Sequence, residues 1–395
     1  MGGSYRECIE ELKQKFQPTN DVSRFGKSGV CEVKTDGSLR NGIELTTVGR
    51  KVNFLEMYQQ YKSIVDVMMD YNPDMNSRAG LHNHVLFDYG SYHDNNEIQF
   101  NELVFKNFMQ LIKRHFPELV WLTSTVKPID SVTEDNVITR DSNFCEHGTL
   151  FRTSINRPVG EYKDIVLDGV RYKAVNFNRL RIINNKIERF HIELRFPDGS
   201  IYPAQIAAQN VLYLAMLLKA VDLSEVGLIS TGDDWEETKT LTTKIRNNEG
   251  NHCGDDRCSD NGLEDSDVEL VKNRAKEFIQ FLKNNINTIE PKSYSILMCL
   301  AEKPISLMRR EMSDLAINEY FDSIIKTSFK DNTNEDILKL IAAQEITGCN
   351  SKENWCYKAA QVTGMQYKDV DSTIKLMSTL RNLRFDYETG QIIEE

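Results

Sequence analysis

Residues with catalytic potential alternate along the segment 190–196. His191, Glu193 and Arg195 occupy every second position, so they share one face of the strand that this segment predicts. The opposite face is apolar and should meet a core: Phe190, Ile192, Leu194 and Phe196. An imidazole, a carboxylate and a guanidinium in one row could bind an anionic substrate or a metal ion. The alternative is an ordinary half-exposed strand that carries mixed charges.

Other polar side chains occupy strand-like segments elsewhere in the chain. His82 and His84 share a face within Gly80-Leu81-His82-Asn83-His84, and Glu44 alternates with apolar residues in 42–47. Carboxylates with histidines suit Mg²⁺ or Mn²⁺. Arginines suit polyphosphate or carboxylate groups, because a guanidinium binds two oxygens at once. Four arginines lie in the intervening segments: Arg152, Arg157, Arg171 and Arg179.

A metal ion beside arginines around an anionic ligand is the equipment of phosphoryl transfer. The chain contains neither a Walker A loop nor a G-x-S-x-G nucleophile elbow. We interpret His147 and His191 as structural residues. We also do not favour a zinc site at His252, Cys253 and Cys258, because two cysteines at a loose spacing are weak evidence.

The elements that must position these residues follow from periodicity and turn signals. Helices are predicted over 4–16, 53–70, 97–115 and 202–221. Strands are predicted over 30–36, 42–47, 78–87, 119–122, 163–167, 170–177, 179–183 and 187–196. Short connections between strands that have one apolar and one polar face favour antiparallel pairing.

A polar loop divides the chain. Residues 247–266 contain no candidates for a buried core. Helices are predicted after it, over 267–284, 292–302, 306–327, 334–345, 352–363 and 368–383. We therefore expect an α+β domain over 1–246, a linker over 247–266 and an all-helical C-terminal region over 267–395.

Composition limits the classes of function. With 395 residues the chain is long enough for two or three domains, and its net charge of −11 argues against broad binding of nucleic acid or anionic membranes. The apolar run 211–218 is too short to span a bilayer, and no signal peptide is predicted. The eight cysteines form no C-x-x-C pair, so the expected compartment is the cytoplasm.

Six short motifs together resemble the amidoligase family, a branch of carboxylate–amine ligases with a glutamine synthetase-like fold. They appear in the family's order and cover roughly residues 30–220: Asp36–Leu39, Gly42–Leu45, Gly80–His84, Arg152–Arg157, Tyr172–Asn176 and Glu193–Arg195. The resemblance implies an antiparallel sheet of glutamine synthetase-like type packed with helices. It also implies association into a homo-oligomer or a larger assembly.

The resemblance further implies an activity and its residues. ATP would phosphorylate a small-molecule or peptide carboxylate, and an amine would displace the phosphate to leave an amide. The resemblance assigns Glu44, His82 and Glu193 to Mg²⁺ or Mn²⁺, and Arg157 and Arg195 to the carboxylate or phosphoryl group. Its remaining assignments, which concern nucleotide or substrate binding, are His84, Arg152 and Arg179.

One departure from the family pattern leaves an alternative open. The family normally has an opening Glu-x-Glu strand, and no such pair occurs upstream of Asp36. Glu32-Val33-Lys34 instead places a lysine two residues after the carboxylate. A non-catalytic structural or assembly protein that reuses the fold is therefore the second hypothesis. A phosphotransferase on a related fold is a third.

Overall fold

The structure is a computed structural model of the full chain, and a subset of its residues is described here. The described residues are 5–16, 31–36, 42–47, 54–73, 79–88, 102–125, 174–176, 181–183, 186–227, 235–247, 264–325, 349, 351–363, 367, 370–371, 383–386 and 391–394. Within them the fold mixes helices with small antiparallel sheets and is mostly helical, which confirms the α+β class.

The central sheet is built on the strand predicted over 187–196. This strand, β6 (Lys186–Leu194), lies between β3 (Asn83–Asp88) and β4 (Val175–Asn176), and it also pairs with β5 (Arg181–Ile183). All three pairings are antiparallel, as predicted. The pairing of β3 with β6 continues beyond the strands through a bridge between Gly80 and Asp198.

The apolar face of β6 packs against helices. Phe190, Ile192 and Leu194 are buried, which confirms the alternation that the sequence predicted. The ring of Phe190 meets those of Phe105 and Phe108 on α3 (Glu102–Arg114), with centroids 6.5 and 5.8 Å apart. These edge-on contacts between aromatic rings fix α3 over one face of the sheet and leave the other face to the polar residues.

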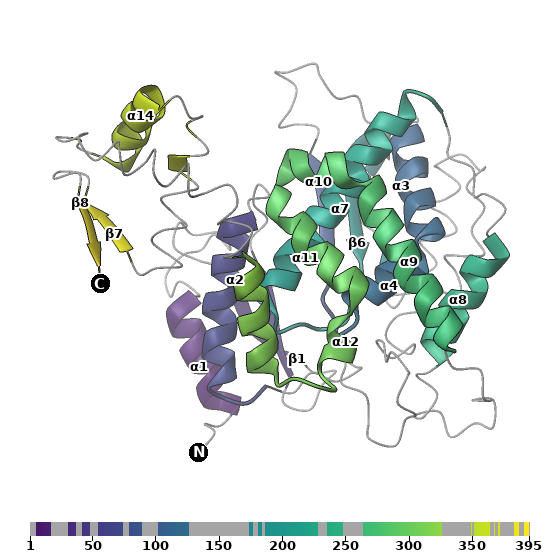
Figure 1. Ribbon diagram of the computed structural model, residues 1–395, viewed down its shortest axis with the longest axis horizontal. Helices are drawn as coiled ribbons and strands as arrows, with labels where there is room; N and C mark the ends of the chain where they lie inside the picture. The colour runs from purple at the N-terminus through teal and green to yellow at the C-terminus, as the bar shows by residue number, and fades with distance from the viewer. Residues whose placement is uncertain are drawn as a thin grey trace.

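The helix α7 (Pro203–Ser224) forms the centre of the main core (Figure 1). Pro203 stands in its first turn, where a missing N–H is tolerated, and most of its alanine- and leucine-rich length is buried. It packs against α2 (Phe54–Met69), α3, α10 (Lys283–Ile289) and α11 (Pro291–Glu302). Among the described residues, α7 is the one helix long and apolar enough to span a membrane. However, 61% of that window is buried inside the fold, as in the core helix of a soluble protein.

A second, smaller core lies beside α2. The strands β1 (Cys31–Asp36) and β2 (Gly42–Thr47) pair as predicted, in a two-stranded sheet of their own. Val33 packs there with Leu12 of α1 (Tyr5–Phe16) and with Ile64 and Val67 of α2. α2 therefore contributes to both cores.

The helices that follow the polar loop belong to the main core. Three helices, α9 (Asp265–Phe281), α11 and one over 314–325, contribute to the hydrophobic cluster that contains α7 and α4 (Phe116–Thr123). Their residues in it include Phe278, Leu297 and Phe321. α12 (Ile305–Met308) is a short turn between them, so the helix predicted over 306–327 is interrupted. In Figure 1, α14 (Lys352–Thr363) lies to the left of these helices, near the strands β7 (Leu383–Asp386) and β8 (Gln391–Glu394).

Two predicted elements are wrong. The strand predicted over 119–122 is part of the helix α4 (Phe116–Thr123), which is buried on every side. A short apolar run has no polar face whose period could distinguish a strand from a helix. The C-terminal region is also not all-helical, because β7 and β8 form an antiparallel hairpin. The predicted strand over 163–167 and helix over 334–345 lie outside the described residues.

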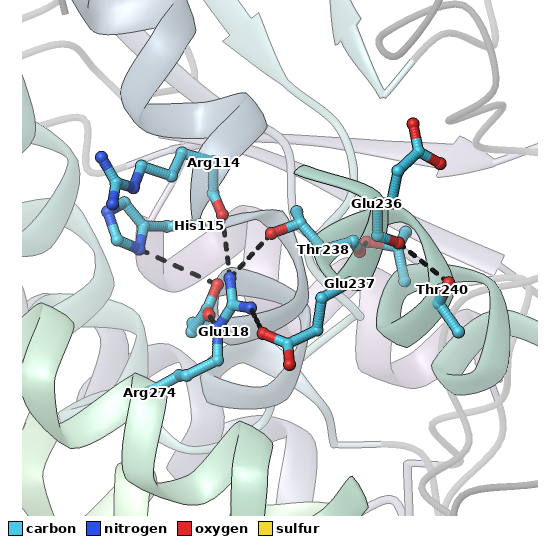
Figure 2. A network of polar contacts seen from close by, with 9 residues as sticks. Arg114, His115, Glu118, Glu236, Glu237, Thr238, Thr240 and Arg274 are labelled. Carbon is cyan, nitrogen blue, oxygen red and sulfur yellow. Dashed lines mark hydrogen bonds and ion pairs between the residues drawn. The ribbon is translucent and has the colours of Figure 1, made fainter. Parts of the chain in front are cut away.

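A buried network of charged residues joins α4 to the helices that follow it (Figure 2). Arg274 of α9 forms an ion pair with Glu118 of α4, whose side chain is fully buried. The same guanidinium donates to Glu237 and Thr238 of α8 (Trp235–Asn247), each at 2.8 Å, and to the carbonyl oxygen of Arg114 at 3.3 Å. One side chain therefore links α3, α4 and α8 to α9.

His115 lies at the edge of this network. Burial, together with the charges of Arg114 and Arg274, lowers the pKa of His115 from 6.5 to about 3. The ring is therefore neutral at physiological pH, and it stacks on Phe278 with 4.1 Å between centroids. His115 thus acts as an aromatic packing residue between α4 and α9.

Candidate active site

The register of the central sheet gathers the polar residues on one face. His84 of β3 and Asn176 of β4 both lie opposite Glu193 of β6. Residues directly opposite one another in antiparallel strands point to the same side of the sheet. Three motifs that are far apart in the sequence therefore meet at Glu193.

The carboxylate of Glu193 is the hub of this cluster. Its Oε1 accepts a hydrogen bond of 2.6 Å from Arg195 and lies 3.2 Å from Nδ1 of His82. Its Oε2 accepts a hydrogen bond of 2.8 Å from the side-chain amide of Asn176. The side chain of Arg195 is 9% exposed and that of His82 is 33% exposed, so the cluster extends from the interior to the surface. We call Asn176, His82, Glu193 and Arg195 the Glu193 cluster.

These contacts control the ionisation of Glu193. Burial alone would raise its pKa, but the hydrogen bond from His82 and the positive charge of Arg195 outweigh that effect. The pKa of Glu193 falls from 4.5 to about 2. The carboxylate is therefore ionised at any physiological pH, and it can orient Arg195 permanently.

Acid should weaken the fold through this group. Since the pKa of Glu193 is lower in the folded chain, its contribution to stability is present above pH 4.5 and is lost as the pH falls towards 2. We expect a loss of about 3 kcal/mol over that range. Urea unfolding at pH 5.0 and pH 2.5 measures it. The variant Glu193→Gln should lack this part of the pH dependence, and an unchanged difference between the two pH values would contradict the prediction.

A pair of histidines lies beside the cluster. Nδ1 of His84 is 3.0 Å from Nε2 of His191, and the two rings meet edge to face. His191 lies two residues from Glu193, the partner of His84 in the register, so the two imidazoles are diagonal neighbours. The sequence predicts a structural role for His191, and the alternation along 190–196 predicts that it shares a face with Glu193. The structure places it beside His84, buried.

The remaining predicted site residues are not brought to this face by the described structure. Glu44 lies on β2, in the other sheet, where it is exposed and stands opposite Lys34. Arg152, Arg157 and Arg179 lie outside the described residues, as does His147. Of the eight predicted site residues, the structure brings together His82, His84, Glu193 and Arg195, and it adds Asn176 and His191 to them.

The described residues do not form a magnesium site on their own. Glu193 and His82 supply one carboxylate and one imidazole, whereas Mg²⁺ prefers several oxygen ligands. Both carboxylate oxygens of Glu193 already accept hydrogen bonds. Within the part of the chain that the structure describes, no three His, Cys, Asp or Glu side chains lie close enough to share a metal ion. This donor set therefore does not fit the predicted metal site.

Comparisons with known proteins add no further assignment. No protein-family model, no curated protein and no solved structure matches the chain.

Proposed function

We propose that the chain is a carboxylate–amine ligase with a glutamine synthetase-like fold. One observation carries the proposal: the residues that resemble the amidoligase motifs meet in space. His82, Asn176 and Glu193 come from three separate motifs, and the side chains of His82 and Asn176 both contact the carboxylate of Glu193. An unrelated mixed-charge strand would not be expected to gather those same residues.

The proposed reaction has two steps. An oxygen of the substrate carboxylate attacks the γ-phosphorus of ATP, and ADP leaves. The amine nitrogen then attacks the acyl carbon of the acyl phosphate, so that a C–N bond forms, the C–O bond breaks with release of phosphate, and the nitrogen releases its proton to water. Negative charge grows on the phosphoryl and acyl oxygens in turn, and fixed positive groups would stabilise it.

The side chains of the site have distinct roles in this proposal. Arg195 would hold the carboxylate or the phosphoryl group through its guanidinium, since its planar fork can bind two oxygens. Glu193 would fix the direction of that guanidinium through the 2.6 Å hydrogen bond. His84 stays the candidate for contact with nucleotide or substrate. Arg152, Arg157 and Arg179 stay candidates from the resemblance alone.

Trapping the acyl phosphate tests the proposal. The full chain is incubated with MgATP, hydroxylamine and a panel of small-molecule and peptide carboxylates. We expect ADP and an acyl hydroxamate to form in equal amounts with at least one carboxylate. The proposal is contradicted if the chain releases no ADP and also binds no nucleotide at millimolar MgATP.

A second candidate is a non-catalytic scaffold, and two features of the site favour it. Both oxygens of Glu193 are engaged by side chains of the protein itself, and Glu44 lies in a different sheet. A ligand that binds the folded chain raises its melting temperature. A scaffold predicts no thermal stabilisation by MgATP, whereas a ligase predicts stabilisation that is reduced by Arg195→Ala.

A further inference from the structure

The turn that follows β6 is tied to the segment that carries His82. The backbone N–H of Leu81 donates to the carbonyl oxygen of Pro197 at 3.1 Å, and that of Gly199 donates to Ala79 at 3.2 Å. These bonds flank the bridge between Gly80 and Asp198. Because Asp198 is three residues beyond Arg195 and Gly80 is two residues before His82, a movement of this turn moves both ends of the Glu193 cluster.

The other side of the turn is held by Thr125, the residue that follows the C-cap of α4. Asp198 is 2% exposed and Thr125 is fully buried. The backbone N–H of Thr125 donates to the carboxylate of Asp198 at 2.9 Å, and its hydroxyl donates to the carbonyl oxygen of Gly199. Thr125 is thus a second anchor, and it fixes the turn from the side that faces the helices.

Arg309 connects this anchor to the helices that follow the polar loop. Its Nη1 donates to the carbonyl oxygen of Thr125 at 2.9 Å, while its other nitrogens donate to both oxygens of Asp314 at 2.9 and 3.2 Å. The hydroxyl of Tyr202, at the end of the turn, donates to the same carboxylate at 2.7 Å. Arg309 and Asp314 therefore hold both ends of the segment 198–202.

This arrangement differs from an ordinary surface ion pair. The side chain of Arg309 is 8% exposed and Tyr202 is fully buried. Burial and the hydrogen bond to Asp314 outweigh the nearby charge of Arg309 and raise the pKa of Tyr202, so its hydroxyl stays protonated and keeps donating. The side chain of Asp314 is 26% exposed, so the pair is partly buried, and its bidentate geometry makes it more directional than a fully exposed pair.

From these contacts we infer that Arg309 and Asp314 are positioning residues for the Glu193 cluster. They hold the segment 198–202, and this segment sets the separation of His82 from Glu193 and Arg195. The residues of the C-terminal helices thus support the geometry of the site through this segment rather than by direct contact with the Glu193 cluster. The inference concerns the geometry of the cluster and holds whichever reaction the site performs.

NMR of the histidine side chains in the full chain tests this inference. The chain has seven histidines, which single His→Asn substitutions assign. Glu193→Gln removes the carboxylate partner of His82, so this variant gives the reference NMR chemical shifts of a His82 ring that has lost that partner. We expect Arg309→Met and Tyr202→Phe to move the His82 signals towards those of Glu193→Gln. His115, which packs between α4 and α9, should keep its signals.

Two comparisons make the test decisive. Lys303→Met breaks an exposed ion pair with Glu311 in the same region and should leave His82 unchanged. Tyr202→Phe removes a single hydroxyl, so it reports on the site even if Arg309→Met does not fold. The inference is overturned if folded Tyr202→Phe keeps wild-type His82 signals, or if His82 and His115 shift together, since that would indicate general loosening.

Discussion

Replacing Glu118 with alanine is expected to lower the free energy of unfolding by about 3–5 kcal/mol. The change leaves the guanidinium of Arg274, which is 12% exposed, without the carboxylate that lies against it. The half-exposed Glu237 then remains as a carboxylate in contact with Arg274, and the desolvation of a weakly compensated guanidinium opposes folding. Urea denaturation followed by circular dichroism measures the loss.

Two further variants define the origin of that loss. Lys303→Met disrupts an ion pair whose side chains are 37% and 68% exposed, so it should cost at most about 1 kcal/mol. The double replacement Glu118→Leu with Arg274→Met removes both charges and should recover most of the stability. A loss below about 1 kcal/mol for Glu118→Ala would contradict the prediction and would show that Glu237 is sufficient to compensate Arg274.

Replacing Arg195 with alanine is expected to lower the rate of hydroxamate formation by about 10²–10³-fold. Arg195 is the guanidinium that Glu193 directs, and the proposed reaction places it at the oxygens on which charge develops. The effect should fall on kcat rather than on KM, because the interaction strengthens in the transition state.

The variant Arg195→Lys separates charge from geometry. It keeps the positive charge but loses the planar fork, so we expect an intermediate rate. A melting temperature close to that of the wild type would show that the fold is kept. If Arg195→Ala retained full turnover, the role proposed for this residue would be wrong even if the chain is a ligase.

Much of the central sheet is predictable from the sequence because its signals are local. The alternation in 190–196 predicts which side of β6 packs against the apolar core, and the turn residues favour antiparallel pairing. The cluster at Glu193 is harder to predict, since it depends on register. A shift of one residue between β3 and β6 would move His84 to the opposite face from Glu193.

Other features of the fold depend on packing that the sequence does not encode locally. Glu44 has the same local pattern as Glu193, yet its strand pairs in a separate sheet. The run 119–122 within α4 is apolar, so its helical state is decided by the surrounding core. Ala174 and Thr125 are likewise important because of contacts with residues 20 or more positions away. The carbonyl oxygen of Ala174 accepts a hydrogen bond from the N–H of Arg195, and the N–H of Thr125 donates to the carboxylate of Asp198.

The continuity of the main core across the polar loop limits how this protein can have evolved. Phe278, Leu297 and Phe321 lie after the loop, yet they share one hydrophobic cluster with α4 and α7. A gene truncated before α9 would encode a chain whose central helix α7 has lost the cover of α10 and α11. Such a shortened descendant would need a new partner protein, or polar replacements on that surface, to remain folded in water.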